Sequence, residues 1–543
     1  MVAGKWFFHS CLALYLIAPL PAAGQWEQDL AAARGFQRSG HYSEAAKAYE
    51  AALTAVQVFG STDPRYLTVV GDLGTLHHER ADYPEAERLY RLALAGWERT
   101  AEPDHGIVAT VAHNLGELLR SRADHAGAEQ YLLKSVALRE SVPGQPSATL
   151  ATTTYSLAEL YTMQGRLDLA LTSALRSLEI SKRAFGPEHP AVARGLLAMA
   201  RIYRAKGLYR EAEDHCRSAG KIFENSGHAE DLALSASMTE LALVQKNQGR
   251  LRDAERSLRR ALLVLKSRPE PNGLKIAAVQ ANLASVLREA GRTDVAEREL
   301  RQALPTLEGA LGPDHPEVAA LLYNLAVVRQ DRGNYGEAEE AYRKALRIFE
   351  HSYSPEHARV ASCVNGLGAL AFDRGRLEEA RQWFSRALAA TEATAGNAHP
   401  DLSVALRNVA AVYLAQRQYA EAEPLLERSI AVMERSLGPQ HPAVASSLLV
   451  YGELLRKTRR GRAARAVEER ANASLAQWQK DNARGFTVDF ARLKDKRYGT
   501  SALWNSGPPR PAASAIPSDW LWWQSLGAER GGATRSSGAL LVQ

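Results

Sequence analysis

The sequence repeats itself every 42 residues, and this period limits the possible folds more than any other feature. Related phrases recur at 42 residues or a multiple of it, namely FGPEHPAVA, LGPDHPEVA, YSPEHARVA, AGNAHPDLS and LGPQHPAVA, which begin at Phe185, Leu311, Tyr353, Ala395 and Leu437. A period between about 20 and 50 residues is typical of arrays in which each unit packs only on its neighbours. The 543-residue chain is therefore predicted to form one array rather than several globular domains.

An alanine occupies the same phase in every unit. Ten successive units carry it, from Ala86 to Ala464, and Ala45 belongs to an eleventh, more N-terminal unit from which one residue is deleted. A small side chain is expected where two antiparallel helices cross closely, because a larger one would push them apart. The pattern predicts eleven repeats across residues 25–481.

Each repeat is predicted to contain two helices, which makes the fold class all-α. Pro190 suits the first turn of a helix, and His189 suits the capping position before it. Apolar residues then recur at three- and four-residue spacing, and Gly207 and Gly227 mark the two helix ends. The loop histidines are expected to cap helices rather than bind zinc, because one repeat would separate neighbours by roughly 15–20 Å. They are His105, His189, His315, His357, His399 and His441.

The segment NLAVVRQDRGNYGEAEEAYRKAL, from Asn324 to Leu346, resembles a tetratricopeptide repeat. The 42-residue period and its G-P-x-H-P linker resemble the kinesin-light-chain type of that repeat. The resemblance implies a right-handed solenoid whose first helices line a concave groove for a protein or peptide ligand. The N-terminal heptad coiled coil by which kinesin light chain binds its motor has no counterpart in this sequence. We therefore transfer the fold and the binding mode, and not the motor.

The segments on either side of the array differ from it in composition. Residues 1–24 combine Lys5, a short apolar stretch at 6–17 and small residues, a pattern typical of a cleaved signal peptide rather than a membrane anchor. Residues 482–543 are rich in Pro, Gly and Ser with scattered Trp, and they are predicted to be disordered. We expect an exported protein, periplasmic or secreted, without stable membrane insertion after cleavage.

Polar residues on the first helix of several repeats are the candidate binding residues. One row consists of asparagines, whose amides can donate to and accept from the backbone of an extended peptide. In grooves of the family that the chain resembles, asparagines at this position contact the ligand backbone. Six residues further on, a row of cations would attract carboxylates. The candidate peptide-binding residues are Asn114, Asn282, Asn324 and Asn408 in the first row, and Arg120, Arg204, Lys246, Arg288 and Arg456 in the second. Alternatively, these are solvated helix residues that pair with neighbours such as Glu117 or Glu289.

The chain carries none of the common catalytic or cofactor-binding motifs. GxxxxGK[ST], GxSxG and HExxH are absent, and Cys11, Cys216 and Cys363 form no CxxC pair. Cys216 and Cys363 take core positions of the repeat and are predicted to be small buried hydrophobes. The net charge of +6 is a mild excess that helix surfaces of mixed sign could produce.

We therefore predict a non-catalytic protein-protein interaction scaffold that needs no cofactor or metal. Its expected partner is a protein or peptide, with acidic ligands favoured by the cationic row, and not a nucleic acid. The alternatives are a regulatory subunit of a separate enzyme and, less favoured, a helical repeat that binds nucleic acid. The 42-residue period and the sparse aromatic residues of the groove, on which bases could stack, disfavour the second alternative.

Overall fold

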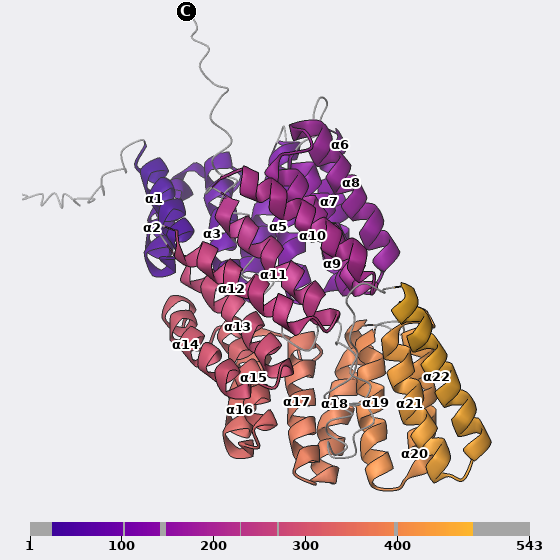
Figure 1. Cartoon of the computed structure of the whole chain (residues 1–543). Helices are drawn as coiled ribbons and strands as arrows, with labels where there is room; N and C mark the ends of the chain where they lie inside the picture. Colours follow the sequence, from indigo (N-terminus) through magenta and orange to yellow (C-terminus); the bar gives the residue numbers. More distant parts are fainter. Residues whose placement is uncertain are drawn as a thin grey trace, which may run out of the picture.

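The computed structural model describes residues 24–100, 104–141, 148–227, 230–268, 271–395 and 400–481. These residues form 22 α-helices and one short 3₁₀ helix, Gln57–Phe59. Consecutive helices pair, so the described chain is a series of eleven helix pairs along a curved path (Figure 1). The predicted signal peptide, apart from Gly24, and the predicted disordered tail lie outside the described residues.

Each pair consists of an A helix followed by a B helix. The A helices are α1 (Gln25–Ser39), α3 (Pro64–Glu79), α5 (His105–Ser121), α7 (Ala148–Met163), α9 (Pro190–Ala205), α11 (Asp231–Asn247), α13 (Gly273–Glu289), α15 (Pro316–Asp331), α17 (Ala358–Asp373), α19 (Pro400–Ala415) and α21 (Pro442–Lys457). The B helices are α2 (Tyr42–Val56), α4 (Tyr83–Glu98), α6 (His125–Ser141), α8 (Leu167–Phe185), α10 (Tyr209–Asn225), α12 (Leu251–Lys266), α14 (Thr293–Leu311), α16 (Tyr335–Ser352), α18 (Leu377–Ala395), α20 (Tyr419–Leu437) and α22 (Gly461–Asp481). The predicted all-α solenoid of eleven helix pairs is confirmed.

Side-chain caps fix where several A helices begin. In four repeats the Nδ1 atom of a loop histidine accepts a hydrogen bond of 3.1 or 3.2 Å from the N–H group two residues on, in His189, His315, His357 and His441. Their predicted capping role is confirmed. The same prediction is wrong for His105, which is the first residue of α5, because Asp104 caps that helix by accepting from the N–H groups of Gly106 and Ile107. Aspartate is among the strongest capping residues, and here it directly precedes the histidine. His399 lies outside the described residues.

The phase alanine is buried between the two helices of each repeat. From Ala45 to Ala464, each of these alanines has at most 1% of its surface exposed. At the crossing of α5 and α6, a Cβ atom added at Gly116 would lie 2.8 Å from Leu132 Cγ and 3.3 Å from the carbonyl oxygen of Ala128. Such a contact is tighter than ordinary van der Waals packing. The predicted close crossing is confirmed.

The A helices lie on the inside of the curve. From α3 to α15, each A helix contacts the A helix of the next repeat directly, in addition to its B-helix neighbours. Within the described residues, B helices of neighbouring repeats make no comparable contact with one another. Each repeat is therefore narrower at its A helix than at its B helix, and stacking such wedges bends the array. The A helices form the inner wall and the B helices the outer wall.

Replacing Ala86 by leucine should destabilise the protein, because α3 and α4 have no room for a larger side chain at their crossing. Overpacking of this kind costs about 1–3 kcal/mol. Ala95→Leu is the matched control, since Ala95 is an exposed alanine of the same helix, and we expect it to change stability by less than about 0.5 kcal/mol. Urea unfolding followed by circular dichroism measures both. Equal curves for the two variants would show that the helix register is wrong.

Candidate peptide-binding surface

The nine predicted binding residues all lie on A helices, but they differ in exposure. Arg204, Asn282 and Asn408 are buried, and Arg456 is exposed. The other five are half-buried, namely Asn114, Arg120, Lys246, Arg288 and Asn324. Direct contact with the next A helix explains this burial, because it covers polar groups that would face water on an isolated helix. The accessible part of the inner wall is therefore a narrow strip.

The helices α11, α13 and α15 bring three of the predicted residues together. Lys246 Nζ lies 2.9 Å from Ser285 Oγ and 3.1 Å from a carboxylate oxygen of Glu289. Ser285 in turn lines a small pocket together with Arg288 and Asn324. We call Lys246, Ser285, Arg288 and Asn324 the central patch. It is continuous across three successive repeats, and Ser285 is a member that the sequence reasoning missed.

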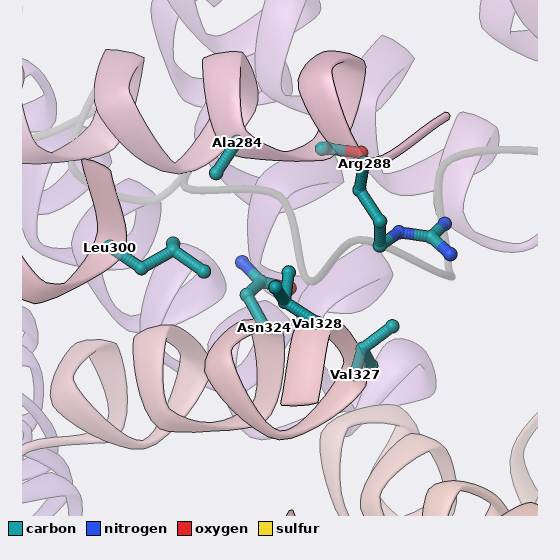
Figure 2. Close-up of a pocket in the computed structure, with 7 residues that line it drawn as sticks. Ala284, Arg288, Leu300, Asn324, Val327 and Val328 are labelled. Carbon is teal, nitrogen blue, oxygen red and sulfur yellow. The ribbon is translucent and has the colours of Figure 1, made fainter. Parts of the chain in front are cut away.

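The pocket of the central patch is small and partly apolar. Its volume is about 20 Å³, which suits one water-sized polar group. Figure 2 shows the Asn324 side chain directed into the space between the helices, while the Arg288 side chain extends from the opposite helix with its guanidinium turned away from Asn324. The remaining lining residues are Ala284, Leu300, Val327 and Val328. An amide beside an apolar floor can hold a peptide group of a ligand while the floor contacts its side chain.

Two cations of the central patch already face carboxylates of the next A helix. An Arg288 nitrogen lies 3.0 Å from Asp331 Oδ2 on α15, and Lys246 is paired with Glu289 on α13. Burial alone would lower the pKa of Arg288, but Asp331 and Glu289 raise it above its ordinary value. Each carboxylate follows its cation by 43 residues, which is one repeat period plus one residue. A search of the sequence at that spacing would have found them.

The cations nearer the N-terminus are also paired with carboxylates. Arg204 Nε lies 2.5 Å from Glu240 Oε1 across the contact of α9 with α11, and Arg201 Nε lies 3.6 Å from the other oxygen of the same carboxylate. Arg120 pairs at 2.8 Å with Glu117 on its own helix. Glu117 and Glu289, the two carboxylates of the alternative interpretation, thus both pair with cations of the row. The inner wall carries alternating charges rather than a purely cationic stripe.

The last predicted residues lie apart from the central patch. Asn408 donates from Nδ2 to Asn365 Oδ1 at 2.6 Å, which joins α19 to α17. Arg456 reaches Glu468 within its own repeat at 2.7 Å, near the C-terminal end of the array. Asn114 lies on α5, several repeats before the central patch. The structure therefore brings Lys246, Arg288 and Asn324 together, and not the whole set.

Two cysteines lie in the described part of the chain. Cys216 and Cys363 are buried, as predicted, and burial raises the pKa of both thiols. In the described part of the chain, no three His, Cys, Asp or Glu side chains are grouped closely enough to hold a metal ion. None of the helices described combines the length and the apolar character needed to cross a bilayer.

Comparison with known proteins assigns the class of the repeat. The family profile described as tetratricopeptide repeat matches residues 29–99, 71–141, 149–225, 231–309, 282–351, 317–393 and 401–475. These matches cover most of the chain, which therefore belongs to the tetratricopeptide-repeat family. Repeats of this family build protein-interaction scaffolds that are in general non-catalytic. No match was found among curated protein sequences.

Several solved structures are similar to parts of the array. BtubC (BKLC) from P. vanneervenii is 26% identical, with 42% of this chain and 89% of that chain covered and a TM-score of 0.35. The nearly identical TPR-like repeats of a kinesin light chain from Podosopora anserina are 23% identical, with 39% and 99% covered and a TM-score of 0.34. The apo form of the quorum sensor NprR from B. thuringiensis is 14% identical, with 68% and 98% covered and a TM-score of 0.43. The second of these is a kinesin light chain, the protein whose type of repeat this sequence resembles.

Glu240→Ala should destabilise the array strongly, because it removes the carboxylate that pairs with the buried Arg204 guanidinium and one of the two carboxylates near the half-buried Arg201. Removing one partner of a buried pair typically costs about 3–5 kcal/mol. Glu85→Ala is the control, since the partner Arg88 is 61% exposed, and such surface pairs contribute about 1 kcal/mol or less. Urea unfolding of both variants gives the comparison. A loss for Glu240→Ala no larger than for Glu85→Ala would contradict the buried cluster.

Proposed function

We propose that this protein is a non-catalytic scaffold that binds an extended segment of a protein or peptide along its inner wall. The observation that carries the proposal is the central patch, in which polar side chains from three successive A helices form one continuous surface beside an apolar pocket. An extended peptide presents a donor or an acceptor at each residue, so a row of amide, hydroxyl and cationic groups suits its backbone.

The charges of the inner wall support a ligand of mixed polarity. Lys246 and Arg288 each face a carboxylate, so an incoming acidic side chain would compete with Glu289 or Asp331. A ligand that places backbone carbonyl groups near the cations, and its own cations near the carboxylates, would keep every charge paired. We propose that such a ligand binds in preference to a strongly acidic one.

Random peptides displayed on phage and selected on the full chain give a direct test. The selected peptides should bind at least tenfold more weakly to the double variant Arg288→Ala with Asn324→Ala, because both side chains line the pocket and make few core contacts. Fluorescence anisotropy of labelled synthetic peptides measures the affinities, and circular dichroism checks that the variant is folded. Raised salt should weaken binding to the parent.

The matched control removes polar side chains from the outer wall. Arg256, Arg259 and Arg260 are exposed on the B helix α12, and their joint replacement by alanine should leave peptide affinity unchanged. If the selected peptides bind the inner-wall variant as tightly as the parent, the central patch is not the binding site. If they bind the outer-wall variant more weakly instead, the ligand lies on the B helices.

We also propose that the protein acts after export, as the pattern of residues 1–24 predicts. N-terminal sequencing of the protein recovered from its natural source should then begin at Gly24 or Gln25, because cleavage is expected after Ala23 or Gly24. A mature protein that still begins at Met1 would contradict export by a cleaved signal.

A further inference from the structure

Two of the capping histidines contact a part of the array far away in sequence. His357 Nε2 lies 3.1 Å from the main-chain carbonyl oxygen of Ser121, at the end of α5 and 236 residues earlier. The His315 ring interacts with the backbone of Glu79, at the end of α3, across the same separation. Each histidine thus begins an A helix in one repeat and lies against the end of the A helix six repeats earlier.

A third contact continues this series. The His441 ring lies against Gly207, just beyond the end of α9, where an added Cβ atom would come within 2.9 Å of the ring. Figure 1 shows the arrangement behind these contacts, with the array from α13 to α22 forming a second tier beside the tier of α1 to α12. We call the row formed by His315, His357, His441 and the facing helix ends the seam.

Side chains hold the seam together. The hydroxyl groups of Tyr83 and Tyr353 lie 3.4 Å apart with their rings stacked, and the Tyr353 ring also stacks on His357 at 3.9 Å. Among the described residues, the extensive packing between helices is confined to each repeat and its next neighbours. Because stability in a solenoid resides in those neighbour interfaces, the seam can separate while every repeat stays folded.

We propose that the loop histidines latch the two tiers together and that their protonation releases the latch, so that the solenoid opens along the seam in mild acid. The latch is independent of the proposed peptide binding and would operate without a ligand.

The hydrogen-bond geometry explains why a proton would break the latch. Nδ1 of each histidine accepts from a helix N–H group, so the hydrogen of the neutral ring must be on Nε2. In His357 that nitrogen then donates to the Ser121 carbonyl. A second proton on Nδ1 would face the N–H donor, remove the helix cap and place a buried positive charge at the positive end of the helix dipole.

The surroundings of His357 oppose its protonation. Burial, together with the charges of Arg359 and His125, lowers the pKa of His357 to about 3, whereas the Ser121 carbonyl acts in the opposite sense. Tyr353 covers the face of the ring. His357 is therefore neutral as long as the seam is closed.

The other two seam histidines behave alike. Burial lowers the pKa of His315 to about 4; Glu317 and the Glu79 backbone act to raise it and Arg359 to lower it. Burial lowers the pKa of His441 to about 4. An exposed histidine has a pKa near 6.5. Their contribution to the closed state is thus complete above about pH 6.5 and is lost as the pH falls toward 4. If the pKa of a seam histidine is 4 in the closed state and 6.5 in the open state, protonation at pH 5 shifts the equilibrium about 30-fold toward the open state for each histidine.

Two further groups lie on the α3 side of the seam. Burial raises the pKa of the Glu79 carboxyl to about 7. Protonation of Glu79 below pH 7 therefore favours the closed state, and it offsets the effect of about one protonated histidine. Burial lowers the pKa of His78 to about 4, and its ring packs edge-on against Tyr83, so it acts in the same sense as the loop histidines wherever opening exposes it. The combined effect of the three loop histidines and these two groups still favours opening in acid.

Labels across the seam test the proposal in the full chain. Arg80 and Asp314 are exposed neighbours of Glu79 and His315, so nitroxide labels on Arg80→Cys and Asp314→Cys report their separation. Cys11→Ser removes a competing thiol, and the buried Cys216 and Cys363 remain. We expect one short distance at pH 7.5 and a second, longer distance at pH 5, with the helical circular dichroism retained. An unchanged distance, or a longer distance that appears only as helicity is lost, would overturn the proposal.

A label pair within one tier is the first control. Arg80→Cys with Arg122→Cys marks the ends of the neighbouring helices α3 and α5, and this distance should not respond to pH. If it lengthens as much as the distance across the seam, the repeats themselves are deforming and the latch is refuted.

Histidine variants identify the groups responsible. The triple variant carries H315Q, H357Q and H441Q. Glutamine retains an N–H donor near the Nε2 position but cannot be protonated, so this variant should stay closed at pH 5. H189Q is the matched control, because His189 caps α9 in the same way but stacks on Phe185, at the end of the helix α8 that directly precedes it in the chain. It should open like the parent.

Opening of the triple variant at the parental pH would overturn the assignment. If the triple variant does not fold, H441Q alone must move the midpoint of opening to lower pH, and an unmoved midpoint counts against the latch.

Discussion

The close crossing of two helices at one alanine is the constraint on which the rest of the structure depends. Between α5 and α6, a methyl group at Gly116 would be crowded by the Leu132 side chain and by the carbonyl oxygen of Ala128. All eleven phase alanines are fully or almost fully buried. The crossing fixes the shape of each repeat as a wedge. Wedges stacked with their narrow sides together place A helix against A helix, and the curvature of the array follows from that contact.

Curvature in turn decides what the polar residues of the A helices do. Arg204 and Glu240, 36 residues apart, meet because α9 and α11 touch on the inside of the curve. A hydrogen bond between Asn408 and Asn365 likewise joins two A helices, α19 and α17. Groups that would be solvated on an isolated helix are thereby paired with one another. The inner wall that remains for a ligand is narrow and carries both signs of charge.

The outer parts of the repeats use charge in a different way. Arg250 pairs with Glu213, and Arg292 with Glu255, so that the turn after an A helix is tied to the preceding B helix. Arg460 and Glu423 make the same link near the C-terminus. Such partly exposed pairs contribute little individually, but they recur along the array and account for many of its charges. The net charge of +6 therefore says little about a partner.

The sequence by itself determined the period, the helix pairs, the crossing alanine and most of the caps, because each of these signals lies within one 42-residue unit. His189 with Pro190 shows how local such a signal is. The same reasoning failed at His105, where a neighbouring aspartate takes the cap, and it placed the cations correctly on A helices without finding Asp331 or Glu289. Only the tertiary structure decided which polar groups are buried together and that His357 meets Ser121 across 236 residues. Those contacts arise from a small rotation per repeat that accumulates over six repeats, and no pattern within a single repeat encodes that sum.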